Sequence, residues 1–101
     1  MIVYNTTFNV APNYEIPFLE FLEQEYILDS LNTKLLHTPK FMRLLGNIPD
    51  EGSTYSLQFN CNDIESYLKF EENFAGELQD GISAKFGENV LFFCSVLEVL
   101  F

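Results

Sequence analysis

The sequence predicts an α+β domain in which strands and helices follow one another in the order βαββαβ. Two patterns carry this prediction. Apolar and polar residues alternate through Ile2–Val10 and again through Ser53–Cys61, which is the period of a half-buried strand. Each of these strands precedes a longer segment, residues 14–31 and 62–86, whose apolar residues recur at the spacing of an amphipathic helix.

The first helix is expected to follow a strand whose apolar side is interrupted only by Thr6. Asn13 is predicted to cap this helix, and Pro17 to lie in its first turn, where the missing N–H would be unpaired in any case. Acidic residues would face water. The predicted apolar stripe consists of Phe18, Phe21, Leu22 and Leu28.

The middle of the chain is interpreted as a hairpin. Residues 32–40 show no clear period and are interpreted as a connection, and residues 41–48 as the second strand. Residues 49–52 suit a type I turn in which Gly52 takes a positive φ. That turn would lead into Ser53–Cys61, the central strand around which the chain is organised.

The second helix is expected to open at a capping box formed by Asn62 and Glu65, and to end at Gly87. Gly76 and Gly81 within it lower helix propensity; they either permit close packing or make the helix irregular. Its predicted apolar stripe comprises Ile64, Leu68, Phe74, Ala75, Leu78, Ile82 and Phe86. Residues 90–101 are apolar on both faces, as in a strand that is covered on both sides.

Two βα units joined by a hairpin form the split βαβ arrangement of a ferredoxin-like fold. Right-handed crossovers then predict a four-stranded antiparallel sheet of order 4-1-3-2 with both helices on one face, in a single domain, residues 1–101. Strand one would separate strands three and four. Cys61 and Cys94 are therefore predicted to form no disulfide within one chain and to behave as small buried side chains.

The last strand carries a second apolar row that helices on one face cannot cover. A symmetric second copy is the simplest cover for that row, so the sequence predicts a homodimer formed through the open sheet face. The row consists of Phe93, Leu97 and Val99, opposite Phe92, Cys94 and Val96.

The composition argues against several classes of partner. Acidic residues outnumber basic ones by 15 to 5, which gives a formal net charge of −10 at pH 7 and disfavours nucleic acid and membrane surfaces. One His and two Cys without CxxC or HExxH spacing predict no metal site, and no cofactor is expected. No secretory signal or membrane-length apolar run is found, so a soluble cytoplasmic protein is expected.

Three stretches resemble a family of short bacterial proteins of unknown function: residues 1–10 (MIVYNTTFNV), 52–59 (GSTYSLQF) and 67–79 (YLKFEENFAGELQ). That family is similar to the dimeric α/β-barrel superfamily, whose protomer is ferredoxin-like, and the resemblance spans essentially the whole chain. The superfamily includes cofactor-free monooxygenases, isomerases, haem-handling enzymes and proteins with no shown chemistry. The resemblance therefore implies a protomer and a pairing, and no particular reaction.

Two positions depart from the pattern of that family. Its members often have Glu-His-Ile-Pro at the end of the first helix, where this chain has Glu25-Tyr26-Ile27-Leu28, and a second frequent His corresponds to Ile82. If those imidazoles transfer protons in relatives, this chain lacks that capacity or uses Tyr26 differently.

Asn5, Thr7, Gln58 and Tyr26 are the candidate ligand-binding residues. The first three, with Asn9 and Ser56, would present donors and acceptors on the open sheet face, where two sheets meet in a dimer. The simpler interpretation, which the ordinary wetness of interfaces favours, is that these groups hydrogen-bond across the dimer and to trapped water, or face solvent. Tyr26 is a candidate because it stands where relatives carry a histidine.

No catalytic residue is predicted. Histidine is the residue type best suited to acid–base chemistry near neutral pH, which makes His37 the natural candidate, but no carboxylate lies near it in sequence to orient it. This favours a surface or packing role for His37. The leading hypothesis is a homodimeric, non-catalytic module that binds a small polar or aromatic ligand or another protein. The alternatives are a cofactor-independent monooxygenase or isomerase and an acidic protein–protein adaptor.

Overall fold

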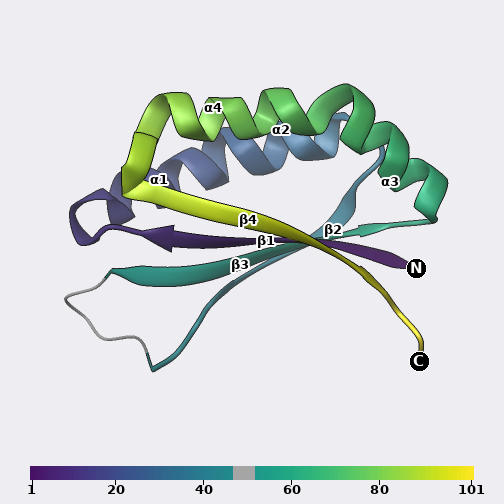
Figure 1. Ribbon diagram of the computed structural model, residues 1–101, viewed down its shortest axis with the longest axis horizontal. Coiled ribbons are helices and arrows are strands. Elements are labelled where there is room, and N and C mark those ends of the chain that lie inside the picture. Colours follow the sequence, from purple (N-terminus) through teal and green to yellow (C-terminus); the bar gives the residue numbers. More distant parts are fainter. Residues whose placement is uncertain (47–51) are drawn as a thin grey trace.

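The computed structural model describes residues 1–46 and 52–101 as a four-stranded antiparallel sheet covered on one face by helices (Figure 1). The strands are β1 (Ile2–Val10), β2 (His37–Arg43), β3 (Ser53–Cys61) and β4 (Val90–Glu98). Their spatial order is β2-β3-β1-β4. The predicted ferredoxin-like fold and strand order are confirmed.

Both crossovers are helices that contain a wider π-helical turn at their middle. The first consists of α1 (Glu15–Phe21), a π turn (Leu22–Tyr26) and α2 (Ile27–Asn32). The second consists of α3 (Ile64–Phe70), a π turn (Glu71–Ala75) and α4 (Gly76–Phe86). Short 3-10 turns, Pro12–Tyr14 and Gly87–Asn89, adjoin the two crossovers. Both crossovers lie on the same side of the sheet (Figure 1).

The core lies between the sheet and the helices. Alternate residues of β1 and β3 are buried, and aromatic rings from the helices pack on them. The ring of Phe18 lies 5.0 Å from that of Phe8, and the ring of Phe70 lies 5.2 Å from that of Tyr4. This close aromatic packing fixes both crossovers on one face of the sheet.

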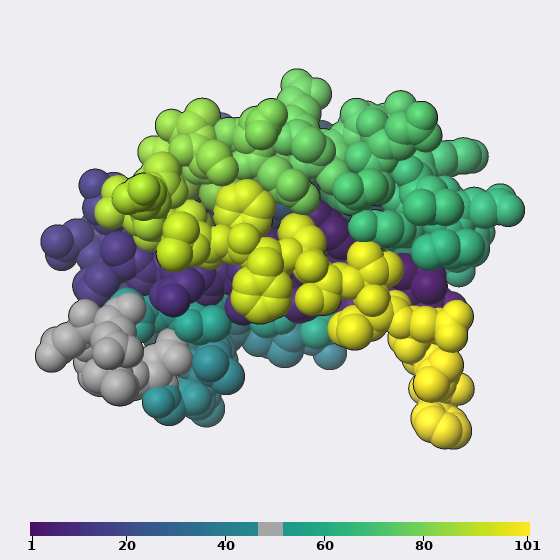
Figure 2. Space-filling model, in the orientation of Figure 1, coloured from purple at the N-terminus to yellow at the C-terminus, as the bar shows by residue number. Residues whose placement is uncertain are grey.

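The two central strands have the bounds that their alternation predicts. In the pairing of β1 with β3, Asn5 is opposite Gln58 and Thr7 is opposite Ser56, so the predicted polar row is assembled on the open face. The last strand ends at Glu98, before the predicted end at residue 101. Residues 99–101 continue beyond the sheet, and their side chains project from the molecule (Figure 2).

The second strand was predicted at residues 41–48, but it begins four residues earlier, at His37. It is an edge strand with an irregularity between His37 and Lys40, and Thr38 has a φ of 53°. An edge position with a bulge tolerates Pro39, which the sequence pattern places in a connection. The strand also ends earlier than predicted, at Arg43, since residues 44–46 lie outside it. Residues 47–48 of the predicted strand and 49–51 of the predicted turn lie outside the described residues. Gly52 has the expected positive φ, +90°.

The two predicted helix caps are wrong. Asp63, not Asn62, caps α3, because its carboxylate accepts a hydrogen bond from the backbone N–H of Ser66 at 2.8 Å. The side chain of Asn62 instead contacts His37. Asn13 lies inside the 3-10 turn and makes no side-chain cap. Pro17 is in the first turn of α1 as expected, and Gly87 ends α4.

The predicted apolar stripes are wrong in part because each π turn shifts the face that is buried. Counting back from Phe86 at 3.6 residues per turn leads to Leu68 and Ile64, but both are exposed. The additional residue of the π turn rotates the preceding helix by about 100°, so that Phe70 is buried in their place. Leu28 and Phe74 are likewise exposed, whereas the other predicted stripe residues are buried or partly buried.

No helix within residues 1–46 and 52–101 combines the length and the apolar character required to cross a membrane.

Candidate functional site

A pocket of about 540 Å³ lies between the two crossovers, where the first π turn and α2 run alongside α4. Both π turns contribute residues to its wall, and π turns inside helices occur frequently at functional sites. We refer to it as the interhelical pocket. It is lined by Phe21, Glu25, Tyr26, Asp29, Asn32, Thr33, Phe74, Glu77, Leu78, Gly81 and Lys85.

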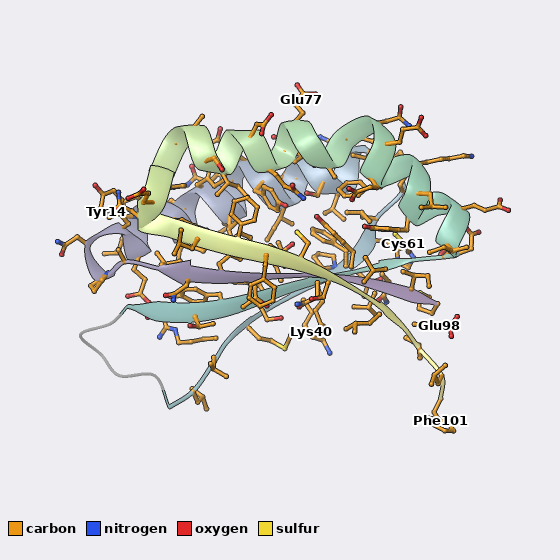
Figure 3. The ribbon with its side chains drawn as sticks, viewed as in Figure 1. Tyr14, Lys40, Cys61, Glu77, Glu98 and Phe101 are labelled. Carbon is orange, nitrogen blue, oxygen red and sulfur yellow. The ribbon has the colours of Figure 1, made fainter. Side chains whose placement is uncertain are left out.

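The interhelical pocket combines an apolar inner wall with a charged rim. Tyr26 is buried and Phe21 and Leu78 are half-buried, whereas the charged side chains around them are exposed. Glu77 points away from the sheet, on the outer side of the helix layer (Figure 3). A pocket with this arrangement offers apolar contact to the body of a ligand and charge to its end.

One cation already lies at the rim. The ammonium of Lys85 is 3.4 Å from a carboxylate oxygen of Glu25 and 5.1 Å from the centroid of the Phe21 ring. Gly81 leaves its part of the wall open, because a Cβ built there would have no neighbour within 4 Å. Gly81 therefore does not serve to let another element pack closely against the helix. Gly76 does not serve this purpose either, because a Cβ built there would also have no neighbour within 4 Å.

A second group of polar side chains lies where β1, β4 and α4 meet, and we call it the seam cluster: Tyr4, Thr6, Gln79 and Cys94. The Tyr4 hydroxyl is 3.2 Å from the Cys94 sulfur, and the Thr6 hydroxyl is 3.6 Å from it. The Gln79 amide donates to the Tyr4 hydroxyl at 3.3 Å and to the Cys94 sulfur at 3.5 Å. The cluster extends from the buried centre of the sheet to an exposed thiol.

Burial keeps the tyrosines near the seam cluster protonated. Burial is the largest cause that raises the pKa of Tyr4, and its hydrogen bond with Cys94 adds to the shift. Burial is also the largest cause that raises the pKa of Tyr26, and electrostatic repulsion from the Cys94 sulfur adds to it. Both phenols are therefore protonated at neutral pH and present hydroxyl groups that can donate and accept hydrogen bonds.

The sequence patterns did not identify Gln79 as a candidate site residue, and they did not predict that Cys94 is exposed. Cys61 is buried as predicted and donates to the Leu35 carbonyl at 3.4 Å, but Cys94 is exposed, so that prediction was wrong for one cysteine. The physical reason is that β4 is an edge strand, and α4 leaves a band of its surface uncovered (Figure 2). Both thiols are free, as predicted.

The sheet divides the four predicted ligand-binding residues into two places. Asn5, Thr7 and Gln58 lie together on the open face. There the Ser56 hydroxyl donates to the side-chain oxygen Oδ1 of Asn5 at 2.6 Å, and the side-chain nitrogen Nδ2 of Asn5 donates to the Thr7 hydroxyl at 3.2 Å. Tyr26 lies on the opposite side, in the wall of the interhelical pocket. The structure does not bring it near the other three.

The open sheet face is apolar around this polar row. Leu91 and Phe93 of β4 are 59% and 63% exposed there. Within the four strands, which are described in full, the register places no Asp or Glu on this face. Its one charged side chain is Lys40, which lies below the sheet in Figure 3.

His37 lies at the start of β2, where its ring contacts two neutral groups. One ring nitrogen is 2.9 Å from the Thr38 hydroxyl and the other is 2.8 Å from the side-chain oxygen of Asn62. These contacts fix the ring at the surface end of the sheet and give it no carboxylate partner among the described residues.

Comparison with known proteins identifies the family. Residues 1–100 match the family described as "Domain of unknown function (DUF4286)". The chain belongs to this family. No curated protein matches it.

Solved structures with the same fold cover the whole chain. A dimeric ferredoxin-like protein from an uncultured marine organism is 16% identical, with a TM-score of 0.70 over 100% of this chain and 96% of that one. An ethyl tert-butyl ether D (EthD) family protein from Bacillus halodurans is 17% identical, with a TM-score of 0.70 over 99% and 100%. A protein proposed to be an antibiotic biosynthesis monooxygenase, from Deinococcus radiodurans, is 12% identical, with a TM-score of 0.63 over 98% and 92%. These similarities show the fold that this family shares with them.

Proposed function

We propose that this protein is a homodimeric, non-catalytic module that binds a small molecule in the interhelical pocket of each protomer. The observation that carries the proposal is the pocket itself, whose volume of about 540 Å³ is within the usual range for small-molecule sites. Aromatic and aliphatic side chains supply its contact surface, and a few polar groups at the rim would orient the ligand. Neither Tyr26 nor the rim provides a nucleophile paired with a base.

The dimer is proposed to form through the open sheet face. Exposed side chains of β4 give that face an apolar surface of the kind that a second copy covers. Two chains of net charge −10 repel each other, but the strands present no carboxylate on this face, so the repulsion is weakest there. The marine protein of the same fold is described as dimeric, which supports this assembly. In the dimer, Asn5, Thr7 and Gln58 would hydrogen-bond across the interface or to trapped water.

The proposed dimer is tested by Phe93→Asp, measured by size-exclusion chromatography with light scattering. The wild type is expected at twice the chain mass of 11.7 kDa, and the variant at the mass of one chain, because each protomer would then place an unpaired carboxylate in an apolar interface. Ile16→Asp, at a 71% exposed position on α1, is the control and should remain dimeric. A monomeric wild type at micromolar concentration would overturn the dimer.

Ligand binding is tested by filling the pocket. Gly81→Leu should place a side chain in the open part of the wall, whereas Gly76→Leu makes the same change on the same helix outside the pocket. Thermal shifts with a library of small aromatic and aliphatic compounds of all charges should identify binders to the wild type and to Gly76→Leu. These shifts should be lost in Gly81→Leu. Compounds that bind all three proteins equally, or a library without binders, would argue against the pocket as the site.

A second candidate function is a cofactor-independent monooxygenase or isomerase, and the observation that favours it is the seam cluster. Tyr4 and Gln79 provide hydrogen-bonding groups beside the exposed Cys94 thiol, at the boundary of sheet and helices. The Deinococcus protein has the same fold and is proposed to be a monooxygenase. The wild-type protein should then consume oxygen in the presence of electron-rich phenols, and it should do so faster than the Gln79→Leu variant. Equal uptake would argue against the monooxygenase.

We also propose that the protein is cytoplasmic, since its two free thiols suit a reducing compartment.

The acidic adaptor hypothesis has support from the net charge alone. No group of side chains in the described part of the chain favours it over ligand binding.

A further inference from the structure

We infer that the interhelical pocket selects an organic cation, that is, an ammonium carried on an aromatic or aliphatic body. This inference rests on the proposed function, because it names the class of ligand for the same pocket. It follows from the charge of the rim, from the aromatic rings beneath it, and from the cation that the rim already holds.

The rim has an excess of negative charge. Three carboxylates line the pocket, those of Glu25, Asp29 and Glu77, against the single ammonium of Lys85. Lys85 pairs with Glu25, and within residues 1–46 and 52–101 neither Asp29 nor Glu77 makes an ion pair. The pocket therefore retains two carboxylates that a ligand cation would neutralise. The net charge of the chain also attracts cations from solution and repels anions.

Aromatic rings lie where such a cation would enter. Phe21, Tyr26 and Phe74 line the pocket together with these carboxylates. A ring face attracts an ammonium through its quadrupole, and more strongly where water is excluded. Carboxylates combined with aromatic faces are thus the groups that recognise an amine with an apolar body.

Lys85 shows that this recognition geometry exists within the protein itself. Its ammonium interacts with one carboxylate, that of Glu25, and with one aromatic ring, that of Phe21. A ligand ammonium would compete with Lys85 for these two groups or would bind between Asp29 and Glu77. In either case removal of the Lys85 charge should strengthen the binding of a cation.

A bare metal ion fits the pocket less well than an organic cation does. In the described part of the chain, no three His, Cys, Asp or Glu side chains are grouped closely enough to hold a metal ion. The carboxylates are instead distributed around an apolar wall, which a metal ion would not use. The apolar wall and the separated charges together favour a ligand with a hydrocarbon body.

The inference is tested with three probes of similar shape: phenethylammonium, phenethyl alcohol and phenylacetate. Titration calorimetry at pH 7 should give the ammonium an affinity about tenfold above that of the alcohol, as one charged and one cation–π contact would produce. Phenylacetate should bind least. The preference should decrease as salt is added, since the rim is exposed to solvent.

Charge-neutralising variants identify the groups responsible. Asp29→Asn and Glu77→Gln should each weaken phenethylammonium binding about fivefold or more while leaving the alcohol unchanged. Glu72→Gln serves as the control, because it removes one carboxylate charge from the crossover that also carries Glu77, at a position that does not line the pocket. Lys85→Met should tighten phenethylammonium binding, an effect opposite in sign to a simple loss of structure.

The outcomes separate this inference from the proposal on which it rests. If the alcohol or phenylacetate binds as tightly as the ammonium, and Gly81→Leu abolishes that binding, cation selectivity is wrong and the ligand pocket stands. If the ammonium binds equally well to Gly81→Leu, the pocket is not the site and both are wrong. Equal effects of Glu72→Gln and Glu77→Gln would also overturn the inference, because only long-range charge would then be involved.

Discussion

The hydroxyl of Tyr4 lies 3.2 Å from the sulfur of Cys94, so a buried tyrosine of a central strand reaches the exposed thiol of the edge strand. In the pairing of β1 with β4, Cys94 is opposite Thr6, and Tyr4 is its diagonal neighbour. Gln79 joins the two from α4. This small network links the edge strand to the sheet centre and to the helix layer.

Tyr4→Phe should therefore lower the free energy of unfolding by about 1 kcal/mol, since it removes a largely buried hydroxyl that forms hydrogen bonds with Cys94 and Gln79. Urea denaturation followed by circular dichroism measures the change. Tyr14→Phe removes a hydroxyl from an exposed position and should change the stability by less than about 0.5 kcal/mol. Equal effects of the two substitutions would show that the Tyr4 hydroxyl contributes no stability through the network.

The two cysteines should react with thiol reagents at very different rates. Cys94 is exposed, whereas Cys61 is 0% exposed and burial raises the pKa of its thiol. Because the thiolate is the reactive form, Ellman's reagent should titrate one thiol in the native protein and two after unfolding in guanidinium. Cys94→Ser should abolish the native reaction, and Cys61→Ser should leave it intact. Comparable native rates for both thiols would contradict the burial of Cys61.

Two glycines with the same φ of +90° should tolerate alanine differently. A Cβ at Gly52 would overlap the carbonyl oxygen of Val10, whereas a Cβ at Gly46 would meet nothing within 4 Å. Gly46→Ala therefore introduces backbone strain alone, about 1 kcal/mol. Gly52→Ala should be destabilising by at least about 1 kcal/mol more, because the chains of β1 and β3 must separate locally. Thermal unfolding of the pair measures the difference, and equal stability of the two variants would exclude the predicted overlap.

The alternation in the sequence predicted the central strands to the residue because each has one face buried under helices and one open. That condition holds for Ile2–Val10 and Ser53–Cys61. It fails for β2, whose position at the edge leaves both faces largely exposed, so its residues carry no periodic signal. The irregularity beside Thr38 weakens the pattern further.

The helices and the site were less predictable for a different reason. A π turn changes the period within a helix, so a 3.6-residue count predicts Leu68 in the core and misses Phe70. The pocket combines residues from two crossovers that are distant in sequence, and only the packing of the crossovers places Asp29 and Glu77 around the same cavity. Tyr26, a candidate because of its position in the family pattern, does line the pocket, but no sequence pattern links it to the other residues of the pocket wall.

The contact between Tyr55 and Glu15 provides a prediction for acid stability. The Tyr55 hydroxyl donates to the Glu15 carboxylate, and the Arg43 guanidinium is 3.2 Å from the same oxygen. A hydrogen bond from Ser53, then that from Tyr55, hold the pKa of Glu15 below its ordinary value of 4.5. Because the pKa is lowered in the folded state, these contacts stabilise the protein fully above about pH 4.5, and this stabilisation disappears as the pH falls through the folded pKa.

Glu15→Gln should consequently lower the free energy of unfolding at pH 7 by about 1 kcal/mol, a value reduced for the partial exposure of the groups. The difference from the wild type should shrink as the pH is lowered below 4.5, because the wild-type carboxylate becomes protonated and loses the same interactions. Urea denaturation between pH 3 and pH 7 measures both quantities. Glu20→Gln, on the same helix and outside these contacts, is the control and should follow the wild type across the range. A Glu15→Gln difference that stays constant from pH 7 to pH 3 would mean that the carboxylate charge does not contribute and that the loss reflects packing alone.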